Sequence, residues 1–379
     1  MIASTDATDR NWWRHSVASV AHDPLRGMRI KPNSRSPADP GKRPMRTTPN
    51  LLILGWLLLS AAFATAQPAA ALDKVKFPYS PISYHSLPFL VAYEAKLFDK
   101  YGLAVDPIFA GASSLIVQSM LAGEADLAGM AGPAVISNVL KGGDVIQVAA
   151  LVKSFSVPLY VQPNITQIGQ LSGKRVGVTR FGSVSHFTAK AILDRSNVQD
   201  AVILQTGGYP ESMTALSTNA IAGAMIPAPQ SVVLREKGFH ELVSIKQIRD
   251  MNIRFVEQGI VARRGFAEKN PDLVKRFISA VYDGLKKIHD DKVLALKVLA
   301  KFTKITRQNM LNESYQAGID AFAKDPRVPP EVFKDLADQL VGLKLIDGAE
   351  AQKTPLTAYF DNRYVDELEK SGFFKRLWQ

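Results

Sequence analysis

A polar turn at residues 179–186 has the residue types for nucleophilic chemistry, for phosphate binding or for binding another anion. Its sequence, TRFGSVSH, presents Arg180, Ser183 and His186 directly after a β-branched run. A hydrolase nucleophile elbow has the pattern Gly-x-Ser-x-Gly on a strand-to-helix turn, followed along the chain by an acid and a histidine. Residues 182–186 lack the final glycine, and the two later histidines lie in helix-like segments. The pattern therefore argues against a nucleophile elbow.

Other catalytic and cofactor motifs are missing from the sequence. No Walker loop is present, and the dinucleotide pattern Gly-x-Gly-x-x-Gly is not found at the strand-to-helix turns. The histidines are scattered without the spacing of a metal site. The chain has no cysteine, which excludes disulfides, thiolate metal sites, cysteine nucleophiles and a lipid-modified cysteine. We therefore expect no catalytic residue, no metal site and no cofactor.

Anion binding is the remaining chemistry for this turn. A helix is expected to begin near Ser185, and the backbone N–H groups of a first helical turn have no partner within the helix. The helix dipole favours negative charge at that end. Arg180 would add a charge-assisted hydrogen bond. The alternative is structural, with Ser183 capping the helix and Arg180 pointing into solvent.

Similar polar turns recur at other expected strand ends. Because ligands of open α/β sheets bind beyond the carboxyl ends of the strands, we expect these turns to meet at one site. Tyr84 and Tyr209 would flank the ligand there, or else form partly packed surface. Met130 would line an apolar wall of the pocket, or else pack in the core. The candidate ligand-binding residues are Ser83, Tyr84, His85, Ser113, Ser114, Met130, Arg180, Ser183, His186 and Tyr209.

The segments that carry these turns alternate between strand-like and helix-like patterns. The run VIQVAALV at 145–152 is typical of a buried strand, and amphipathic stretches separate it from similar runs. This alternation predicts an α/β fold with mainly parallel sheets covered by helices on both faces. The second half overlays on the first with a shift of 95 residues, which places Met130 on Met225. We infer two similar α/β lobes with a ligand between them.

The C-terminal part, residues 262–379, has a different pattern. Pro271 follows Asn270, a combination typical of the start of a helix. Further helices are predicted at 293–302, 307–323, 330–341 and near the C-terminus. We expect these helices to pack on one lobe and to add no separate chemistry.

The first 71 residues differ from the rest of the chain. Residues 1–44 are rich in Pro, Arg, Ser and Asp and have no periodic apolar face, so we interpret them as an extension upstream of a start at Met45. Residues 51–66 form an uncharged apolar run, which is shorter than the ~20 residues of a membrane span and ends in small residues. The stretch 45–71 is therefore typical of a secretory signal, and a transmembrane anchor is the alternative.

The charge of the chain excludes one class of partner. It carries 46 Lys and Arg against 35 Asp and Glu, a formal net charge of +11. After residue 66 the excess falls to +6 and is spread along the chain without a basic block. This distribution argues against nucleic-acid binding. Net charge alone does not identify a ligand.

Four segments together resemble the nitrate/sulfonate/taurine-type periplasmic substrate-binding proteins of ABC transporters and the related thiamine-pyrimidine-precursor binding proteins. They are LPFLVAYEAKLFDKYGLAVD, GASSLIVQSMLAGEADLAG, LSGKRVGVTRFGSVSHF and GIVARRGFAEKNPDLVKRFISAV. The resemblance implies a two-lobed, type II periplasmic binding protein, in which each lobe is a mixed, mainly parallel sheet flanked by helices, with a C-terminal helical extension. It implies lobe I at 72–161 and 256–379, and lobe II at 162–255.

The resemblance also implies a function. The chain would be an exported, non-enzymatic receptor that captures a small anionic solute of the sulfonate, nitrate, taurine or carboxylate class. Its place would be the periplasm, its partner an ABC transporter permease with its ATPase, and its state a monomer. Three alternatives stay open: a thiamine-pyrimidine-precursor binding protein, a pyrimidine-forming or hydrolytic enzyme, and a sensor for a signalling partner. The cysteine-rich motif of eukaryotic pyrimidine-synthesising relatives is missing, which argues against the enzyme.

Overall fold

The computed structural model describes residues 71–379, apart from 154–156, 252 and 254. The predicted extension 1–44 lies outside these residues, as does the predicted signal 45–71 except for its last residue. Within the described part of the chain, no helix combines the length and the apolar character that crossing a membrane requires.

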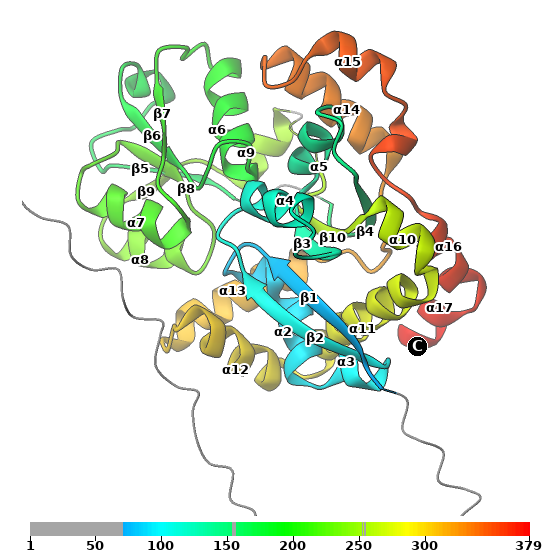
Figure 1. The fold of residues 1–379 in the computed structure, drawn as a ribbon. Helices are drawn as coiled ribbons and strands as arrows, with labels where there is room; N and C mark the ends of the chain where they lie inside the picture. The colour runs from blue at the N-terminus through cyan, green and yellow to red at the C-terminus, as the bar shows by residue number, and fades with distance from the viewer. Residues whose placement is uncertain (1–70, 154–156, 252, 254) are drawn as a thin grey trace, which may run out of the picture. The chain divides into compact units, whose positions relative to one another are not determined.

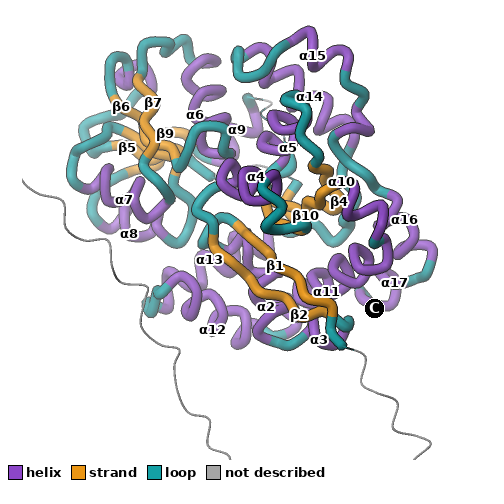
Figure 2. Tube along the Cα trace, viewed as in Figure 1, coloured by secondary structure: helices purple, strands orange, loops and turns teal. Residues whose placement is uncertain are grey.

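Five strands form a first, mixed sheet. They are β1 (Asp73–Tyr79), β2 (Leu103–Phe109), β3 (Leu127–Met130), β4 (Val145–Val152) and β10 (Gln258–Arg263). Their order is β2-β1-β3-β10-β4 (Figures 1 and 2). β1 runs parallel to β2 and β3, whereas β10 runs antiparallel to β3 and β4. Every residue of β4 is buried, because helices cover both faces of the sheet, and this explains the continuous apolar run predicted there.

Five further strands form a second sheet with the same plan. They are β5 (Leu159–Val161), β6 (Arg175–Val178), β7 (Val202–Gln205), β8 (Gly223–Met225) and β9 (His240–Val243). Their order is β7-β6-β8-β5-β9. β6 runs parallel to β7 and β8, whereas β5 runs antiparallel to β8 and β9. In each sheet three parallel strands are therefore followed by one antiparallel strand, which is β10 in the first sheet and β5 in the second. The chain reaches each of these two strands as it crosses from the other sheet.

The chain crosses between the two sheets twice. β4 ends at Val152 in the first sheet and β5 begins at Leu159 in the second, so the first crossing lies before Leu159. The predicted end of lobe I at residue 161 is thus too late, because the three residues of β5 pair with β8 and β9. The chain returns to the first sheet between the end of β9 at Val243 and the start of β10 at Gln258.

Helices flank both sheets (Figure 1). The first half contains η1 (Tyr84–Ser86), α2 (Leu87–Glu94), α3 (Leu97–Lys100), α4 (Ser113–Leu121) and α5 (Gly132–Val139). The second half contains η2 (Ile168–Leu171), α6 (Val184–Arg195), α7 (Tyr209–Ser217), α8 (Gln230–Glu236) and α9 (Ile245–Asp250). The C-terminal part contains α10 (Arg264–Lys269), α11 (Pro271–Asp290), α12 (Lys292–Thr303), α13 (Gln308–Ala321), α14 (Pro330–Gly342), α15 (Gly348–Lys353), η3 (Leu356–Ala358), α16 (Arg363–Lys370) and α17 (Phe373–Leu377).

The longest of these helices is α11, which packs on lobe I. It starts at Pro271, where the sequence predicts a helix, and it packs against α2 and α3. Phe277 of α11 contacts Phe77 of β1, with ring centroids 4.8 Å apart. Gly284 allows a close approach of the two helices, because a Cβ there would lie 2.7 Å from the backbone oxygen of Pro88 in α2. The apolar face of α11 is thus buried against lobe I.

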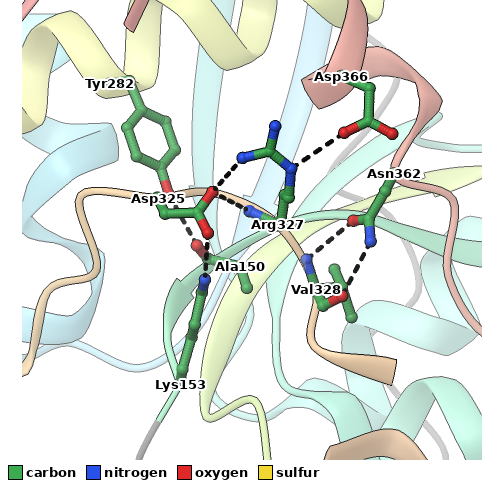
Figure 3. A network of polar contacts seen from close by, with 8 residues as sticks. All are labelled: Ala150, Lys153, Tyr282, Asp325, Arg327, Val328, Asn362 and Asp366. Atoms are coloured by element: carbon green, nitrogen blue, oxygen red, sulfur yellow. Dashed lines mark hydrogen bonds and ion pairs between the residues drawn. The ribbon is translucent and has the colours of Figure 1, made fainter. Parts of the chain in front are cut away.

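A polar network joins the C-terminal part to the end of β4 (Figure 3). The Tyr282 hydroxyl of α11 donates to Ala150 O at 2.7 Å. Asp325, in the loop between α13 and α14, accepts from Lys153 Nζ at 3.5 Å and from Arg327 Nη1 at 3.1 Å. Because Lys153 directly follows β4, these contacts hold the start of the first crossing against lobe I.

The network continues to α16 (Figure 3). Arg327 Nε donates to Asp366 Oδ1 at 3.0 Å. Val328 N donates to Asn362 Oδ1 at 2.8 Å, and Asn362 Nδ2 donates back to Val328 O at 2.9 Å. Both backbone groups of the buried Val328 are therefore satisfied. These contacts link α11, the loop before α14 and the start of α16 to the end of β4 in lobe I.

Candidate functional site

Turns from both sheets line one small space, which we name the cleft pocket. Its volume is about 30 Å³, room for one or two water molecules. It lies at the carboxyl ends of the parallel strands β1, β3 and β6, where open α/β sheets bind ligands. Lobe I contributes Ser80, Pro81, His85, Gly111, Ala112, Ser113 and Ala131, lobe II contributes Thr179, Ser183, Val184, Ser185 and Tyr209, and the returning chain contributes Glu257 and Gln258.

Four helices begin at the wall of the cleft pocket. One of them, α5, offers few donors at its start, because Gly132 N donates to Val256 O at 2.9 Å and Pro133 has no N–H. The other three are α4, α6 and α7, whose N-cap residues are Ala112, Ser183 and Gly208. In the described structure none of these N-caps makes a side-chain capping hydrogen bond, whereas α9, α12 and α15, which begin elsewhere, each have one. Other helices such as α14 are also uncapped, so the convergence of three at one pocket is the distinguishing feature. Their first-turn N–H groups and dipoles favour a bound anion.

Three hydroxyl groups form a triangle on the lobe II wall. Thr179 Oγ1 lies 2.9 Å from both Ser183 Oγ and Ser185 Oγ, which are 3.0 Å apart. Thr179 N donates to Ser185 Oγ at 2.9 Å, and Ser183 Oγ donates to Arg180 O at 2.6 Å. Ser183 therefore closes the turn instead of capping α6, which corrects the structural alternative considered above. The hydroxyls of Thr179 and Ser185 can rotate to donate to a bound acceptor.

A buried imidazole and a buried carboxylate form the opposite wall. His85 Nε2 lies 3.3 Å from Glu257 Oε1, and His85 Nδ1 lies 2.7 Å from Ser83 Oγ. Tyr209 faces the same pocket, and burial, followed by the charge of Glu257, raises its pKa far above the usual range. The Tyr209 phenol therefore stays protonated at physiological pH and can donate a hydrogen bond to a ligand.

Ser83, His85 and Glu257 have the residue types of a hydrolytic triad without its arrangement. A nucleophilic serine must reach the substrate carbonyl. Ser83 is 2% exposed and does not line the cleft pocket formed by the described residues. Ser83 is therefore not placed to act as the nucleophile of an acyl transfer. Across residues 71–379, outside the short gaps, no three His, Asp or Glu side chains gather as a metal site would require.

Four of the predicted ligand-binding residues line the cleft pocket: His85, Ser113, Ser183 and Tyr209. They come from four different turns, two in each lobe, which the strand order brings together. Ser83 lies directly behind His85 as its hydrogen-bond partner. Contact of these residues with a ligand stays a prediction.

The other five predicted residues lie elsewhere. Ser114 and His186 line a second, larger pocket beside the first. Tyr84 and Met130 are buried in apolar clusters, and the Tyr84 ring stacks on His85 at 4.1 Å. Core packing is the alternative expected for Met130, whereas Tyr84 is buried instead of forming partly packed surface. Arg180 lines neither of the two pockets described here, and its Nε is buried with no hydrogen-bond partner among the described residues, so its bond to an anion stays a prediction.

Several pocket residues were missed by the sequence analysis. Thr179 and Ser185 belong to the turn already singled out, but no pattern distinguishes the hydroxyls that face inward. Glu257 and Gln258 had a visible signal, because they interrupt the apolar run FVEQGIVA at 255–262. Gln258 is 1% exposed, and its Nε2 donates to Ser80 O at 3.0 Å. Two adjacent polar residues at the start of a buried strand indicate a site of this kind.

The family model described as NMT1/THI5 like matches residues 83–293. The match covers more than half of the chain and includes the turns that carry His85, Ser113, Ser183, Tyr209 and Glu257. The chain belongs to the NMT1/THI5-like family. No curated protein matches it in sequence.

Solved structures share the fold of this family member at low sequence identity. The periplasmic aliphatic sulphonate binding protein SsuA from Escherichia coli has a TM-score of 0.60 and 17% identity, covering 74% of this chain and 96% of that one. The alkanesulfonate-binding protein SsuA from Xanthomonas axonopodis pv. citri, bound to MOPS, has 0.63 and 14%, covering 75% and 99%. The periplasmic nitrate-binding protein NrtA from Synechocystis PCC 6803 has 0.64 and 10%, covering 79% and 89%. The expected two-lobed, type II periplasmic binding fold is confirmed.

Proposed function

We propose that this family member is the extracytoplasmic solute-binding component of an ABC importer and that it binds a small acid between its lobes. One observation carries the proposal: three helix N-termini and a set of hydroxyls converge on the cleft pocket. An acidic group accepts several hydrogen bonds at once. The backbone N–H groups at helix N-termini can donate these bonds without a positively charged side chain. The sulfonate- and nitrate-binding proteins among the structural neighbours support an acid of this type.

The proposal includes export to the periplasm and delivery to a membrane permease. The stretch 45–71 supports export, because an apolar run ending in small residues is typical of a secretory signal. Two of the structural neighbours are described as periplasmic. A receptor of this kind releases its solute unchanged, so no turnover is expected.

One feature favours a second class of solute. Glu257 lines the cleft pocket, and a carboxylate accepts hydrogen bonds. A solute with N–H groups, such as an aminopyrimidine, can donate to a carboxylate. A thiamine-pyrimidine-precursor binding protein thus remains the second candidate function. In that case no anion would bind at the helix N-termini.

A thermal-shift screen of the purified chain tests the choice, because a ligand that binds only the folded state stabilises it. The panel contains nitrate, taurine, methanesulfonate, acetate and 4-amino-2-methylpyrimidine. Calorimetry then measures stoichiometry, and chromatography of the recovered solute tests for turnover. One-to-one binding of an acid without product supports the proposal. Preference for the pyrimidine favours the second candidate, and steady product formation contradicts both.

A matched pair of variants places the acid in the cleft pocket. Ser113→Ala removes a hydroxyl at the start of α4, and we expect roughly tenfold weaker binding of the acid. Ser172→Ala is the control, because Ser172 is exposed and its hydroxyl bonds Asp200 at 2.6 Å. Equal affinities in the two variants would remove Ser113 from the site.

A further inference from the structure

A second pocket lies directly beside the cleft pocket, and we name it the body pocket. It encloses about 510 Å³, within the range of pockets that hold small organic molecules. α4 and α5 of lobe I, the start of α6 in lobe II and the end of α14 enclose it. Its size contrasts with the cleft pocket, which has room for only a few atoms.

The walls of the body pocket are largely apolar. Val117, Phe187, Leu340 and Leu345 contribute to them, together with Leu121 and Phe181, which are 57% and 49% exposed. The Phe181 ring meets His186 edge to face, with centroids 5.1 Å apart. Large apolar side chains exposed around one concave surface are a feature of ligand sites, because contact with an apolar body removes that surface from water.

Two polar groups in this pocket are suited to a hydrogen-bonding ligand. Asn138 is 5% exposed, and its Oδ1 has no hydrogen-bond partner among the described residues. His186 Nδ1 accepts from Gly182 N at 3.1 Å. Burial, followed by the charge of Lys190, lowers the pKa of His186, so the ring is neutral and carries its hydrogen on Nε2. The wall of the pocket thus contains a buried acceptor without a partner among the described residues, Asn138 Oδ1, and one imidazole donor. Other polar side chains also line it: Ser114, Gln118, Ser137 and Lys141.

The two pockets share a wall. Ser183 lines both of them, and the neighbours Ser113 and Ser114 line one each. A Cβ on Gly182 would lie 3.9 Å from the Ser114 Cβ, so the lobe II turn and the start of α4 meet at this boundary. The two pockets are therefore adjacent, with Ser183, Ser113 and Ser114 at their boundary.

We infer that the solute is an aromatic acid with a hydroxyl or amino group on its ring, the acid in the cleft pocket and the ring in the body pocket. This inference rests on the proposed function and identifies its substrate class. A small anion such as nitrate would leave the apolar walls of the body pocket exposed to water. An aromatic ring covers them, its edge meets Phe181 and His186, and its donor satisfies Asn138 Oδ1.

Calorimetry with two probe series tests the inference on the full chain. The sulfonates are methanesulfonate, benzenesulfonate and 4-hydroxybenzenesulfonate; the carboxylates are acetate, benzoate and 4-hydroxybenzoate. In at least one series we expect the ring to tighten binding about 10- to 100-fold, from the apolar area it buries. We expect the ring hydroxyl to add a further threefold or more, and Asn138→Leu to abolish that gain.

A blocking variant locates the ring. Ser137→Trp places a bulky side chain in the body pocket from a partly exposed wall position, and Ser172→Trp is the exposed control. We expect Ser137→Trp to weaken the aryl acid at least tenfold and to leave the short acid of the series unchanged. If that variant unfolds, Phe181→Ala takes its place, because Phe181 is exposed and its loss does not open the core.

The outcomes separate the inference from the proposed function. If the short acids bind as tightly as the aryl acids, or if the blocking variants do not weaken the aryl acids, the inference is wrong and the proposed function stands. If none of the six acids binds, an acid-binding cleft is itself contradicted.

Discussion

The two lobes have one strand order but differ in how they are built. In lobe I, β1, β2 and β4 are seven or eight residues long, and α11 adds a helix of 20 residues. In lobe II the strands have only three or four residues. Both edge strands have exposed apolar side chains, Ile108 and Phe109 in β2 and Val202 and Leu204 in β7, so the difference lies in the length of the strands and in α11. Lobe I is therefore the more extensively packed half.

In lobe II, where the strands are short, local hydrogen bonds hold the turn that lines the cleft pocket. β6 ends at Val178, and the hydroxyl triangle follows at once. Thr206 Oγ1 donates to Val178 O at 2.9 Å and lies close to Ser212 Oγ. Hydroxyl bonds to the backbone thus hold this turn. Side-chain hydrogen bonds also hold the turn after β1 in lobe I, where Ser86 Oγ donates to Pro81 O at 2.8 Å and Gln258 Nε2 donates to Ser80 O at 3.0 Å.

The comparison predicts the largest loss of stability in the lobe I core. Phe277→Ala should lower the free energy of unfolding by about 3–5 kcal/mol, because a fully buried ring is lost and a cavity remains. Leu204→Ala on the exposed edge of lobe II is the control, with a change within about 0.5 kcal/mol. Urea denaturation measures both. Similar losses in the two variants would show that lobe I does not dominate stability.

A smaller loss is expected where the C-terminal helices are joined to β4. Tyr282→Phe removes the buried hydrogen bond to Ala150 O and should cost about 1–3 kcal/mol, since the carbonyl loses a partner. Thr206→Val makes the corresponding change in lobe II, at a less buried position, and should cost less. A ranking of the two variants in the reverse order, by thermal or urea denaturation, would contradict the contrast between the lobes.

The contact between α8 of lobe II and α13 of the C-terminal part is expected to be weak. Arg235 Nη2 donates to Glu313 Oε1 at 2.6 Å, with both side chains about two-fifths exposed. Arg235→Gln should destabilise the protein by roughly 0.2–1 kcal/mol, and less in high salt, because exposed ion pairs are screened. Denaturation at low and high salt measures the difference. A loss that does not depend on salt would assign Arg235 a packing role, through its contact with the Tyr160 hydroxyl.

The smallest predicted effect concerns pH and the lobe II turn. Because the pKa of His186 is lowered in the folded state, the unfolded chain binds a proton near pH 6.5 that the folded chain does not. Stability should therefore fall as the pH drops below about 6.5, and His186 should add nothing above it. His186→Gln should flatten this decline. An unchanged decline would shift the effect to His289 of α11, whose pKa burial also lowers.

Much of the fold could be predicted because strong local patterns survive folding. The strand predicted at 145–152 is β4, and the helix predicted from Pro271 is α11. The sequence analysis did not identify β9 or α9, and it placed the three residues of β5 in the wrong lobe. β9 has the sequence HELV and contains no apolar run of its own. The lobe to which β5 belongs depends on the strands with which it pairs.

The site divides in the same manner. Residue types and turn positions were sufficient to indicate polar turns at strand ends, and four predicted residues line the cleft pocket. Local patterns did not determine which neighbour faces inward: Ser113 lines one pocket and Ser114 the other, while Tyr84 turns into the core beside His85. Glu257 reaches the pocket only because β10 returns antiparallel beside β3 and β4. Side-chain direction and the pairing of distant strands depend on long-range contacts, so only the folded chain decides them.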